Sequence, residues 1–274
     1  MKNASKKNCY AVFGNPISHS KSPEIHNFFF KKYGFHENYV KICASKENFI
    51  NEILSFFQKG GKGANITLPF KEKVFLLCNS ITKRARIAGS INTIKKYDKN
   101  FLLGDNTDGV GFLSDLLFQN LIKKNFNVLI LGAGGAARGI LHPLLEFECN
   151  IYITNRTFSK AQYLSKKFKK FGNIFSIPIN QLKKNNYHIV INATSTSVFN
   201  VCPLIPSNLI SKEVIYYDMF YGKKDTFFMN FCKKNGAKKV FNGIGMLINQ
   251  AAHSFFLWKK IFPNTKEVFN FLEK

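Results

Sequence analysis

The sequence predicts an α/β protein with two domains, because short apolar segments typical of strands alternate with longer segments typical of helices. The clearest observation is the apolar run Val128-Leu129-Ile130-Leu131, which indicates a parallel strand buried on both faces. A glycine-rich turn follows this run and opens a helical segment that continues to Glu146. The length of 274 residues agrees with the prediction, since it suffices for one large domain or two of ordinary size.

The N-terminal part of the chain contains three predicted strands with helices between them. The strands are expected at residues 9–13, 39–42 and 64–68. A first helix is expected to begin at Ser22, a candidate N-cap, with Pro23 at the first helical position. A second helix is expected at residues 49–57, where Gly60-Gly61 supplies a stop signal, and a third from Lys71 onward.

A β-hairpin is expected next in the chain. Residues 91–97 and 101–103 have the composition of strands, and they flank the polar sequence Asp98-Lys99-Asn100. We therefore expect the chain to reverse direction at this turn.

The segment after the glycine-rich turn alternates regularly between strand and helix. Strands are expected at residues 151–154, 189–191 and 214–217, and a helix at 159–168. This alternation predicts β-α units around a parallel sheet. A first domain is therefore expected over residues 1–107 and a second over about 108–242. The final helix, residues 246–261, is apolar on most faces, and the sequence order alone assigns it to neither domain.

The glycine-rich turn has the features of a dinucleotide-binding site. Gly132 permits the tight turn, Gly134 lets a pyrophosphate approach the backbone, and Ala137 is a small residue where the helix packs on the strand. The helix N-terminus supplies free N–H groups and partial positive charge for the phosphates. A purely structural glycine turn is the alternative, but the strand before it and the helix after it favour a dinucleotide.

The residues after the second strand of this region indicate which dinucleotide is bound. An NAD site usually has a carboxylate there for the ribose 2′-hydroxyl. This chain has Asn155-Arg156-Thr157 with Lys160 one turn later, and no carboxylate. The two cations favour the 2′-phosphate of NADP. The alternative is a solvated loop with Thr157 as a helix N-cap.

Composition argues against a metal site, a membrane segment and secretion. The six cysteines form no C-x-x-C pair and lie at no metal-ligand spacing with a histidine, so we expect reduced thiols and no metal. No apolar run approaches the roughly 18 residues of a membrane helix. Residues 1–8 are polar and lack the apolar core of a signal peptide, so a cytoplasmic protein is expected.

The net charge of +24 raises the question of a nucleic-acid partner. The basic residues are spread over the whole chain, largely as lysine pairs, and form no dense block. The chain is also rich in Phe, Ile and Asn, which together with Lys have A/T-rich codons. We therefore expect a biased composition rather than a nucleic-acid partner.

A series of short motifs along nearly the whole chain carries a family resemblance. In the N-terminal part these are Gly14-Asn15-Pro16-Ile17-Ser18-His19-Ser20-Lys21-Ser22-Pro23, Asn65-Ile66-Thr67-Leu68-Pro69-Phe70-Lys71, Gly89-Ser90-Ile91-Asn92-Thr93 and Gly104-Asp105-Asn106-Thr107-Asp108-Gly109. In the remainder they are the glycine-rich turn to Gly139, Asn155-Arg156-Thr157, Asn192-Ala193-Thr194-Ser195, Tyr217-Asp218-Met219-Phe220-Tyr221, Gly243-Ile244-Gly245-Met246 and Gln250-Ala251-Ala252-His253. With these motifs the sequence resembles the shikimate dehydrogenases.

The resemblance implies a reaction together with its catalytic and substrate-binding residues. The expected reaction is the reversible NADPH-dependent reduction of 3-dehydroshikimate to shikimate, in the pathway leading to chorismate and the aromatic amino acids. Lys71 and Asp108 would be the catalytic pair, since hydride transfer to a ketone needs a proton donor beside the oxygen. The substrate would be bound by Ser20, Ser22, Thr67, Asn92, Asp108, Tyr221 and Gln250. Ser20 and Ser22, helped by Thr67, would hold its carboxylate, although the same residues are compatible with a capping loop.

The resemblance also implies the cofactor site and the domain plan. NADP would be bound by Gly132, Ala133, Gly134, Gly135, Ala136, Asn155, Arg156, Thr157, Lys160, Thr194, Met219, Gly243 and Met246. The C-terminal helix would return to the first domain, giving a substrate domain of residues 1–107 plus 243–274 and a Rossmann-like NADP domain of residues 108–242. We expect a small-molecule substrate, no membrane partner, and a monomer or homodimer.

Two residues depart from the family pattern. The family often has arginine where this chain has Lys160, so a smaller margin of NADP over NAD is expected. Ser197 stands where glycine is common, and a positive φ there would strain the loop. The alternatives are a quinate/shikimate dehydrogenase that also uses NAD, and a basic nucleic-acid-binding protein on a former enzyme scaffold.

Overall fold

The computed structural model describes residues 8–98, 101–183, 187–222 and 224–272. The chain forms two compact units, each built around its own sheet. Unit 1 comprises Met1–Gly111 and Leu247–Lys274, and unit 2 comprises Phe112–Met246. The α/β class is therefore confirmed, and the C-terminal segment belongs to unit 1.

The described part of unit 1 contains a six-stranded mixed sheet in the order β2-β1-β3-β5-β6-β4. Its strands are β1 (Asn8–Gly14), β2 (Asn38–Cys43), β3 (Gly63–Ile66), β4 (Ser80–Ile81), β5 (Thr93–Asp98) and β6 (Phe101–Asp105). β5 runs antiparallel to β3 and β6, and the other pairs are parallel. The predicted hairpin is confirmed by the β5–β6 pairing, although its turn residues Lys99 and Asn100 lie outside the described residues.

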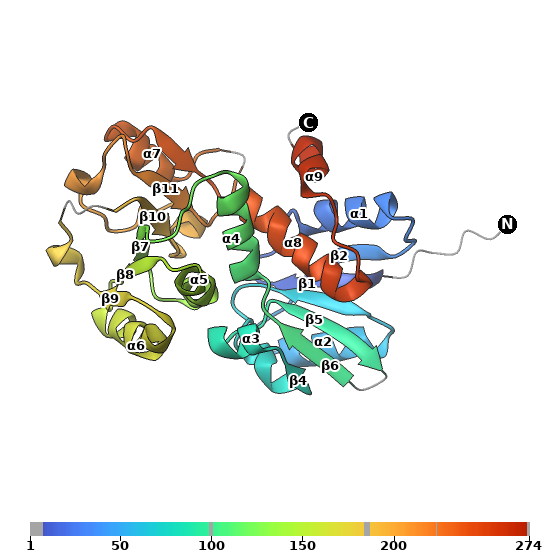
Figure 1. The fold of residues 1–274 in the computed structure, drawn as a ribbon. Coiled ribbons are helices and arrows are strands. Elements are labelled where there is room, and N and C mark those ends of the chain that lie inside the picture. Colours follow the sequence, from blue (N-terminus) through green and yellow to red (C-terminus); the bar gives the residue numbers. More distant parts are fainter. Residues whose placement is uncertain (1–7, 99–100, 184–186, 223, 273–274) are drawn as a thin grey trace. The chain divides into compact units, whose positions relative to one another are not determined.

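Helices cover both faces of this sheet. They are α1 (Ser22–Lys32), α2 (Phe49–Gln58), α3 (Lys83–Ala88), α8 (Ile244–Lys259), α9 (Thr265–Leu272) and the 3-10 turn η1 (Lys73–Leu77), while α4 (Asp108–Phe118) leads from unit 1 into unit 2. α1 and α8 lie on one face and α2 on the other (Figure 1). Strands covered on both sides are apolar at nearly every position, which explains the run at the start of β1.

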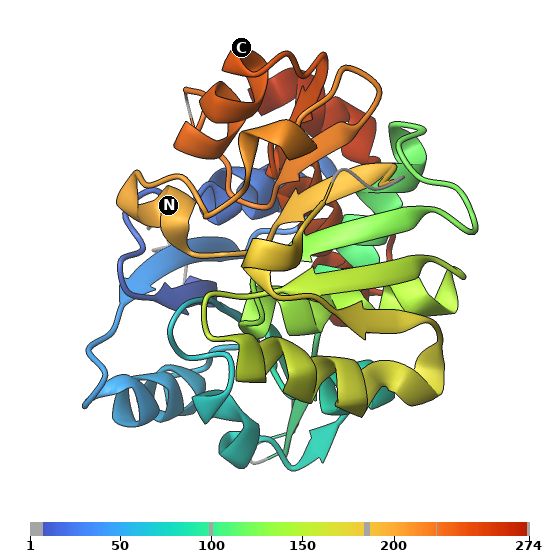
Figure 2. The same ribbon diagram turned by 90° about the vertical axis from the view of Figure 1, so that its left-hand side faces the viewer.

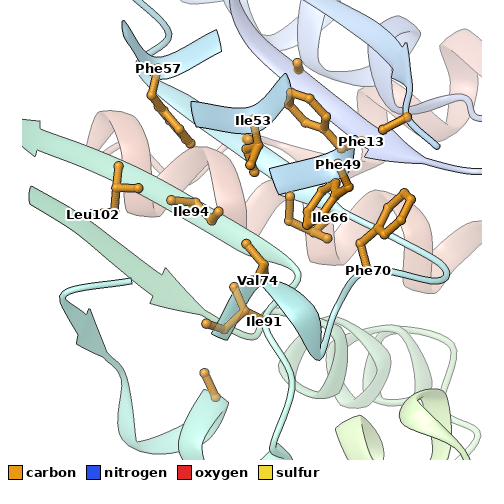
Figure 3. Packing of buried hydrophobic residues seen from close by; sticks show 14 residues of the cluster. Phe13, Phe49, Ile53, Phe57, Ile66, Phe70, Val74, Ile91, Ile94 and Leu102 are labelled. Atoms are coloured by element: carbon orange, nitrogen blue, oxygen red, sulfur yellow. The ribbon is translucent and has the colours of Figure 1, made fainter. Parts of the chain in front are cut away.

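Alternate residues of β1 show the two cores of unit 1. Ala11 and Phe13 belong to a cluster with Phe49 of α2, whose ring stacks on Phe70 at 4.1 Å (Figure 3). Tyr10, on the opposite face, lies 4.7 Å from the ring of Trp258 on α8. Because successive side chains of a strand point to opposite faces, β1 packs against the helices on both sides of the sheet.

The described part of unit 2 contains a six-stranded parallel sheet in the order β12-β11-β10-β7-β8-β9, whose strands lie side by side in Figure 2. Its strands are β7 (Asn127–Leu131), β8 (Asn150–Thr154), β9 (Ile174–Ser176), β10 (Ile189–Asn192), β11 (Ile215–Asp218) and β12 (Lys239–Phe241). Its helices are α5 (Gly135–Glu146), α6 (Phe158–Phe168) and α7 (Phe227–Lys234), with 3-10 turns η2 (Lys169–Phe171), η3 (Ile179–Gln181), η4 (Thr196–Phe199) and η5 (Ser207–Leu209). The order reverses between β7 and β10, as in dinucleotide-binding sheets, so the Rossmann-like prediction is confirmed.

Three local expectations differ from the structure. Ser22 is the first residue of α1 rather than its cap, a shift of one residue at a frayed helix end. The helix expected from Lys71 onward is only the short 3-10 turn η1, because the chain must become extended at Cys78 to enter β4. The last long helix, α8, begins two residues earlier than expected, at Ile244.

Within the described ranges, no helix combines the length and apolar character needed to cross a bilayer.

Candidate active site

The predicted substrate residues of unit 1 gather along one edge of its sheet. Phe13 of β1 lies opposite Ile66 of β3, and these parallel strands end at this edge. Because β5 is antiparallel, it begins at the same edge, with Thr93 between Asn65 of β3 and Asp105 of β6. The segments that leave β1, β3 and β6 therefore meet the segment that enters β5. They carry Ser20, Ser22, Thr67, Lys71, Asn92 and Asp108.

Lys71 and Asp108 form an ion pair at this edge. The Nζ of Lys71 donates a 2.6 Å hydrogen bond to Oδ2 of Asp108. The Lys71 side chain is 21% exposed and the Asp108 side chain 7%, so the pair is largely shielded while part of the lysine side chain stays accessible. A 2.8 Å bond from the Ile91 N–H to the Lys71 carbonyl holds the backbone. The arrangement supplies a positioned proton donor beside a carboxylate.

The amide of Asn92 holds the other oxygen of the same carboxylate. Its Nδ2 donates to Oδ1 of Asp108 at 2.8 Å and to Oε1 of Gln250 at 3.3 Å. Its Oδ1 accepts a 2.8 Å bond from the Thr107 N–H, which fixes the orientation of the amide. The two oxygens of Asp108 thus have separate partners, Asn92 and Lys71.

Gln250 reaches this cluster from α8. Its side chain is buried, and Nε2 donates to the Leu247 carbonyl at 2.9 Å. Gly111 lets α4 approach closely, because a Cβ there would lie 2.5 Å from the backbone nitrogen of Gln250. Gln250 and Asp108, the first residue of α4, are thereby brought to the same place.

A buried network of hydroxyl groups lies behind Asn92. The Oγ of Ser254 donates to the Gln250 carbonyl at 3.0 Å and lies 2.8 Å from Oγ1 of Thr93 and 3.1 Å from Oγ1 of Thr107. The Thr93 hydroxyl donates to Oδ1 of Asn92 at 2.9 Å. Because buried polar groups are costly when unpaired, this network favours a single arrangement of the segments that carry the site.

Ser20, Ser22 and Thr67 lie in the loops that follow β1 and β3. The Oγ of Ser20 accepts a 3.3 Å bond from the Ser22 N–H, and both serines are 5% exposed. The Thr67 N–H donates to the Phe13 carbonyl at 2.9 Å, which joins the two loops at their base. Carboxylate binding by these hydroxyls stays a prediction.

The predicted cofactor residues of unit 2 follow the carboxyl ends of neighbouring parallel strands. Leu131 of β7 is in register with Thr154 of β8 and with Asn192 of β10. Asn192 is in turn in register with Asp218 of β11. The residues directly after these positions are Gly132, Asn155, Ala193-Thr194 and Met219. They therefore lie along the edge where doubly wound sheets bind their ligands.

The glycine-rich turn fits the phosphates of a dinucleotide. Gly132 has φ +109°, and a Cβ there would lie 3.0 Å from the Ala193 carbonyl oxygen, so glycine is required. Gly134 and Gly135 stand at the start of α5, where a Cβ would meet no atom within 4 Å. Open space in front of a helix N-terminus with free N–H groups suits a phosphate. Ala133 lies in the same turn, and Ala136 lies in the first turn of α5.

The loop after β8 is hydrogen-bonded to the glycine-rich turn, and two basic side chains lie within it and in the helix that follows. The Oδ1 of Asn155 accepts a 3.2 Å bond from the Ala133 N–H, and its Nδ2 donates to the Thr157 carbonyl at 2.9 Å. Arg156 and Lys160 are exposed, and Thr157 is the N-cap residue of α6. The sequence has no Asp or Glu between Glu148 and Glu213, so this surface can attract a phosphate.

The remaining predicted residues of unit 2 lie at the ends of β11 and β12. The Met219 N–H donates to the Asn192 carbonyl at 3.1 Å, and the Gly243 N–H donates to the Phe220 carbonyl at 3.0 Å. A Cβ on Gly243 would collide with the Met219 carbonyl, which explains why glycine stands there. Tyr221 stacks on Phe220, and Met246 is buried in α8.

Ser197 is not a strained residue. It lies within η4 and has no positive φ. Its hydroxyl donates a 2.7 Å bond to Oδ2 of Asp218 and accepts a 3.1 Å bond from Nδ2 of Asn192. Burial raises the pKa of Asp218, although the hydroxyls of Thr226 and Ser197 act in the opposite direction. The condition for strain, a positive φ, is therefore not met, and the serine instead links η4 to β11.

Sequence reasoning assigned no role to several buried polar residues around the site. They are Asn65, Thr93, Asp105, Asn106, Thr107 and Ser254. The available signal was the run of four polar residues at 105–108, where β6 ends, since such a run is buried only when each member has a partner.

Two family models match most of this architecture. Residues 12–94 match the shikimate dehydrogenase substrate binding domain, and residues 115–202 match shikimate / quinate 5-dehydrogenase. The two matches fall in unit 1 and unit 2 respectively.

Solved structures resemble the chain over nearly its whole length. An Ael1 enzyme from Pseudomonas putida is 36% identical, with a TM-score of 0.88, covering 97% of this chain and 98% of that one. A shikimate dehydrogenase from Aquifex aeolicus is 28% identical, with a TM-score of 0.90 and 100% coverage of both chains. A shikimate 5-dehydrogenase from Thermus thermophilus, in complex with NADP(H) and shikimate, is 28% identical, with a TM-score of 0.85, covering 95% of this chain and 96% of that one.

Proposed function

The chain belongs to the shikimate dehydrogenase family, and on that premise we propose that it catalyses the reversible reduction of 3-dehydroshikimate to shikimate with NADPH. The observation that carries the proposal is the shielded ion pair of Lys71 and Asp108, with Asn92 bonded to the same carboxylate. The expected place of this reaction is the pathway to chorismate and the aromatic amino acids.

The first step is binding of a small, polyhydroxylated carboxylic acid. We propose that the hydroxyls of Ser20 and Ser22, with Thr67, hold the carboxylate, and that Asn92 and Gln250 bind ring hydroxyls. Hydroxyl and amide groups are suited to this task because each can both donate and accept hydrogen bonds. Tyr221 would line the substrate side of unit 2.

The second step is proton transfer by Lys71. When bound, NADPH would supply the hydride for the carbonyl carbon. The ammonium Nζ of Lys71 gives a proton to the ketone oxygen as negative charge develops on it, and takes a proton from the hydroxyl in the reverse direction. Asp108 orients the lysine through its 2.6 Å bond and keeps a negative charge beside it.

The cofactor proposal concerns NADP in particular. The turn at Gly132–Gly135 would hold the pyrophosphate at the start of α5. Arg156 and Lys160 would bind the 2′-phosphate, a role supported by their exposure and by the lack of a nearby carboxylate in the sequence.

Initial-rate kinetics test the proposal. The oxidation rates of shikimate and of quinate are measured with NADP⁺ and with NAD⁺. The proteins compared are the wild type, Lys71→Ala and the control Lys73→Ala. Lys73 is exposed, and its Nζ bonds only to a backbone carbonyl, that of Lys46, among the contacts of the described residues. We expect rapid oxidation of shikimate with NADP⁺, a loss of about 10²-fold or more in kcat for Lys71→Ala, and wild-type rates for the control.

The other outcomes are informative. Equal use of quinate and NAD⁺ would assign the chain to the broader-specificity members of the family. A folded wild type without turnover on any pair would contradict the proposal.

A further inference from the structure

Behind the Lys71–Asp108 pair lies a second, more deeply buried carboxylate. The side chain of Asp105 is 1% exposed and stands three residues before Asp108. Its Oδ1 accepts bonds from Oγ1 of Thr82 at 2.6 Å, from Nε of Arg84 at 2.7 Å and from the Asn106 N–H at 2.8 Å. Its Oδ2 accepts a bond from Nη2 of Arg84. The guanidinium of Arg84 therefore binds both carboxylate oxygens of Asp105 in a bidentate ion pair.

Arg84 supplies the charge that keeps this carboxylate ionised. Burial alone would raise the pKa of Asp105, but the hydrogen bonds and charge of Arg84, with Thr82 and the Asn106 N–H, lower it below its ordinary value. His253 also faces the pair, and burial followed by the charge of Arg84 lowers the pKa of His253 to about 4. The histidine is therefore neutral near pH 7, and the arginine is the compensating cation.

A continuous set of bonds leads from Asp105 to Asp108. The Asp105 carboxylate fixes the N–H of Asn106, whose Nδ2 donates to the carbonyl and the hydroxyl of Ser90, both at 3.0 Å. The Oδ1 of Asn106 accepts a 3.1 Å bond from the Asp108 N–H. The Asn92 N–H donates to the Asp105 carbonyl at 3.0 Å. Asn92, which bonds the Asp108 carboxylate, and Asn106, which accepts the Asp108 N–H, are thus both joined to Asp105.

We propose that Arg84 is a positioning residue for the reaction: by holding Asp105, it fixes residues 105–108 so that the Asp108 carboxylate meets Lys71 and Asn92. The inference rests on the proposed function, because the importance of Asp108 comes from it. Arg84 itself lies on α3, near Thr82, the N-cap of that helix, and its side chain is 35% exposed. It acts through Asp105 and needs no contact with the substrate.

The test compares Arg84→Gln, Asp105→Asn, the double variant, Arg84→Lys and the control Arg86→Gln. Arg86 is on the same helix, is exposed, and donates only to the Ile81 carbonyl among the bonds of the described residues. We expect kcat for shikimate oxidation to fall about tenfold in Arg84→Gln, because small displacements of a reacting group are costly. KM for shikimate should change less than kcat, since Ser20, Ser22 and Thr67, which are proposed to hold the carboxylate, lie on other segments. Arg84→Lys should lose activity as well, because lysine cannot form the bidentate ion pair.

The double variant tests whether Arg84 acts through Asp105. Residues that act as one unit give non-additive losses, so the double variant should lose no more kcat than the worse single variant. Multiplied losses, a wild-type kcat in folded Arg84→Gln, or a change confined to KM would overturn the inference. If Arg84→Gln fails to fold, Arg84→Lys carries the same comparison.

Hydrogen exchange separates this inference from the proposed function, since it needs no turnover. The amides of Asn106, Thr107 and Asp108 should exchange about tenfold faster in Arg84→Gln than in wild type, with no change in Arg86→Gln. Unchanged exchange would contradict the positioning role even if the enzyme is active. A wild type without activity, but with faster exchange in Arg84→Gln, would contradict the proposed function alone.

Discussion

Lys71 and Asp108 lie 37 positions apart in the chain, yet their side chains meet at 2.6 Å. One stands just after β3 and the other opens α4, so the pair exists only when the sheet of unit 1 is complete. The Asp108 carboxylate is also bonded to Asn92, which is buried. Of its two side-chain partners, Lys71 is therefore the one that is partly exposed to solvent.

Replacing Asp108 with Asn tests the role of the charge. The amide keeps the shape of the side chain but cannot stabilise or orient the ammonium of Lys71 in the same way. We expect kcat for shikimate oxidation to fall by about 10²-fold or more. Steady-state kinetics measure the effect, with exposed Asp98→Asn as the control. A kcat of Asp108→Asn close to wild type would show that the carboxylate is dispensable.

The cations after β8 should set the preference for NADP. We expect Arg156→Gln to lower the ratio of kcat/KM for NADP⁺ over NAD⁺ by about tenfold or more, because a charge-assisted bond to the 2′-phosphate is lost. Lys160→Arg should raise the ratio, since a planar fork binds phosphate better than an ammonium. Lys166 is exposed and lies, like Lys160, on α6, so Lys166→Gln should leave the ratio unchanged. A wild-type preference for NAD⁺ would refute the assignment.

Variants of two glycines in the glycine-rich turn should affect protein stability and cofactor binding separately. Gly132→Ala should lower the free energy of unfolding by about 1–3 kcal/mol, because its φ is +109° and the Cβ would press on Ala193. Gly134→Ala should change stability by less than about 0.5 kcal/mol, because its Cβ would meet no protein atom, yet it should weaken NADPH binding. Denaturant unfolding and a fluorescence titration with NADPH measure the two effects. Unaltered NADPH affinity in Gly134→Ala would place the phosphates elsewhere.

A buried histidine should make the fold sensitive to acid. Burial lowers the pKa of His26 to about 3, below its ordinary 6.5, and its ring stacks on Tyr39 at 4.4 Å. The unfolded chain therefore takes up the proton first, and stability is lost as the pH falls below about 6.5. Between pH 7 and pH 5 this residue should reduce the free energy of unfolding by about 2 kcal/mol.

The measurement is urea unfolding at pH 7 and pH 5 for wild type, His26→Phe and the control His36→Phe. His36 is exposed, so its variant should keep the wild-type difference between the two pH values. In His26→Phe the difference should shrink by about 2 kcal/mol, while the contribution of His253, whose lowered pKa has the same sign, remains. An equal pH dependence in all three proteins would mean that His26 is protonated in the folded state.

The sequence predicted best those elements that are buried on both faces. The strands now seen as β1 and β7 have apolar residues at every core position and were evident as continuous runs. β9 and β12 were not predicted, because three residues are too few for a periodic signal. The sequence around η1 predicts a longer helix, since composition does not reveal where the chain must become extended.

The site was predictable only in part, for a related reason. Motifs named Lys71, Asn92 and Asp108, and the register of the sheet then showed why these residues meet. The pair of Arg84 and Asp105 joins residues 21 positions apart, and no local pattern marks such a contact. The sequence left the loop conformation at Ser197 open, and its hydroxyl is bonded to Asp218, a partner that only the folded chain provides.

Unit 1 is made from two segments, Met1–Gly111 and Leu247–Lys274, which are translated before and after unit 2. The six strands of its described part precede unit 2 in the chain, whereas α8 follows only after unit 2 has been translated. Until then the hydroxyls of Thr93 and Thr107 lack Ser254, and Tyr10 lacks the ring of Trp258. Unit 2 can complete its sheet on the nascent chain, but the polar centre of unit 1 closes only after α8 has followed unit 2.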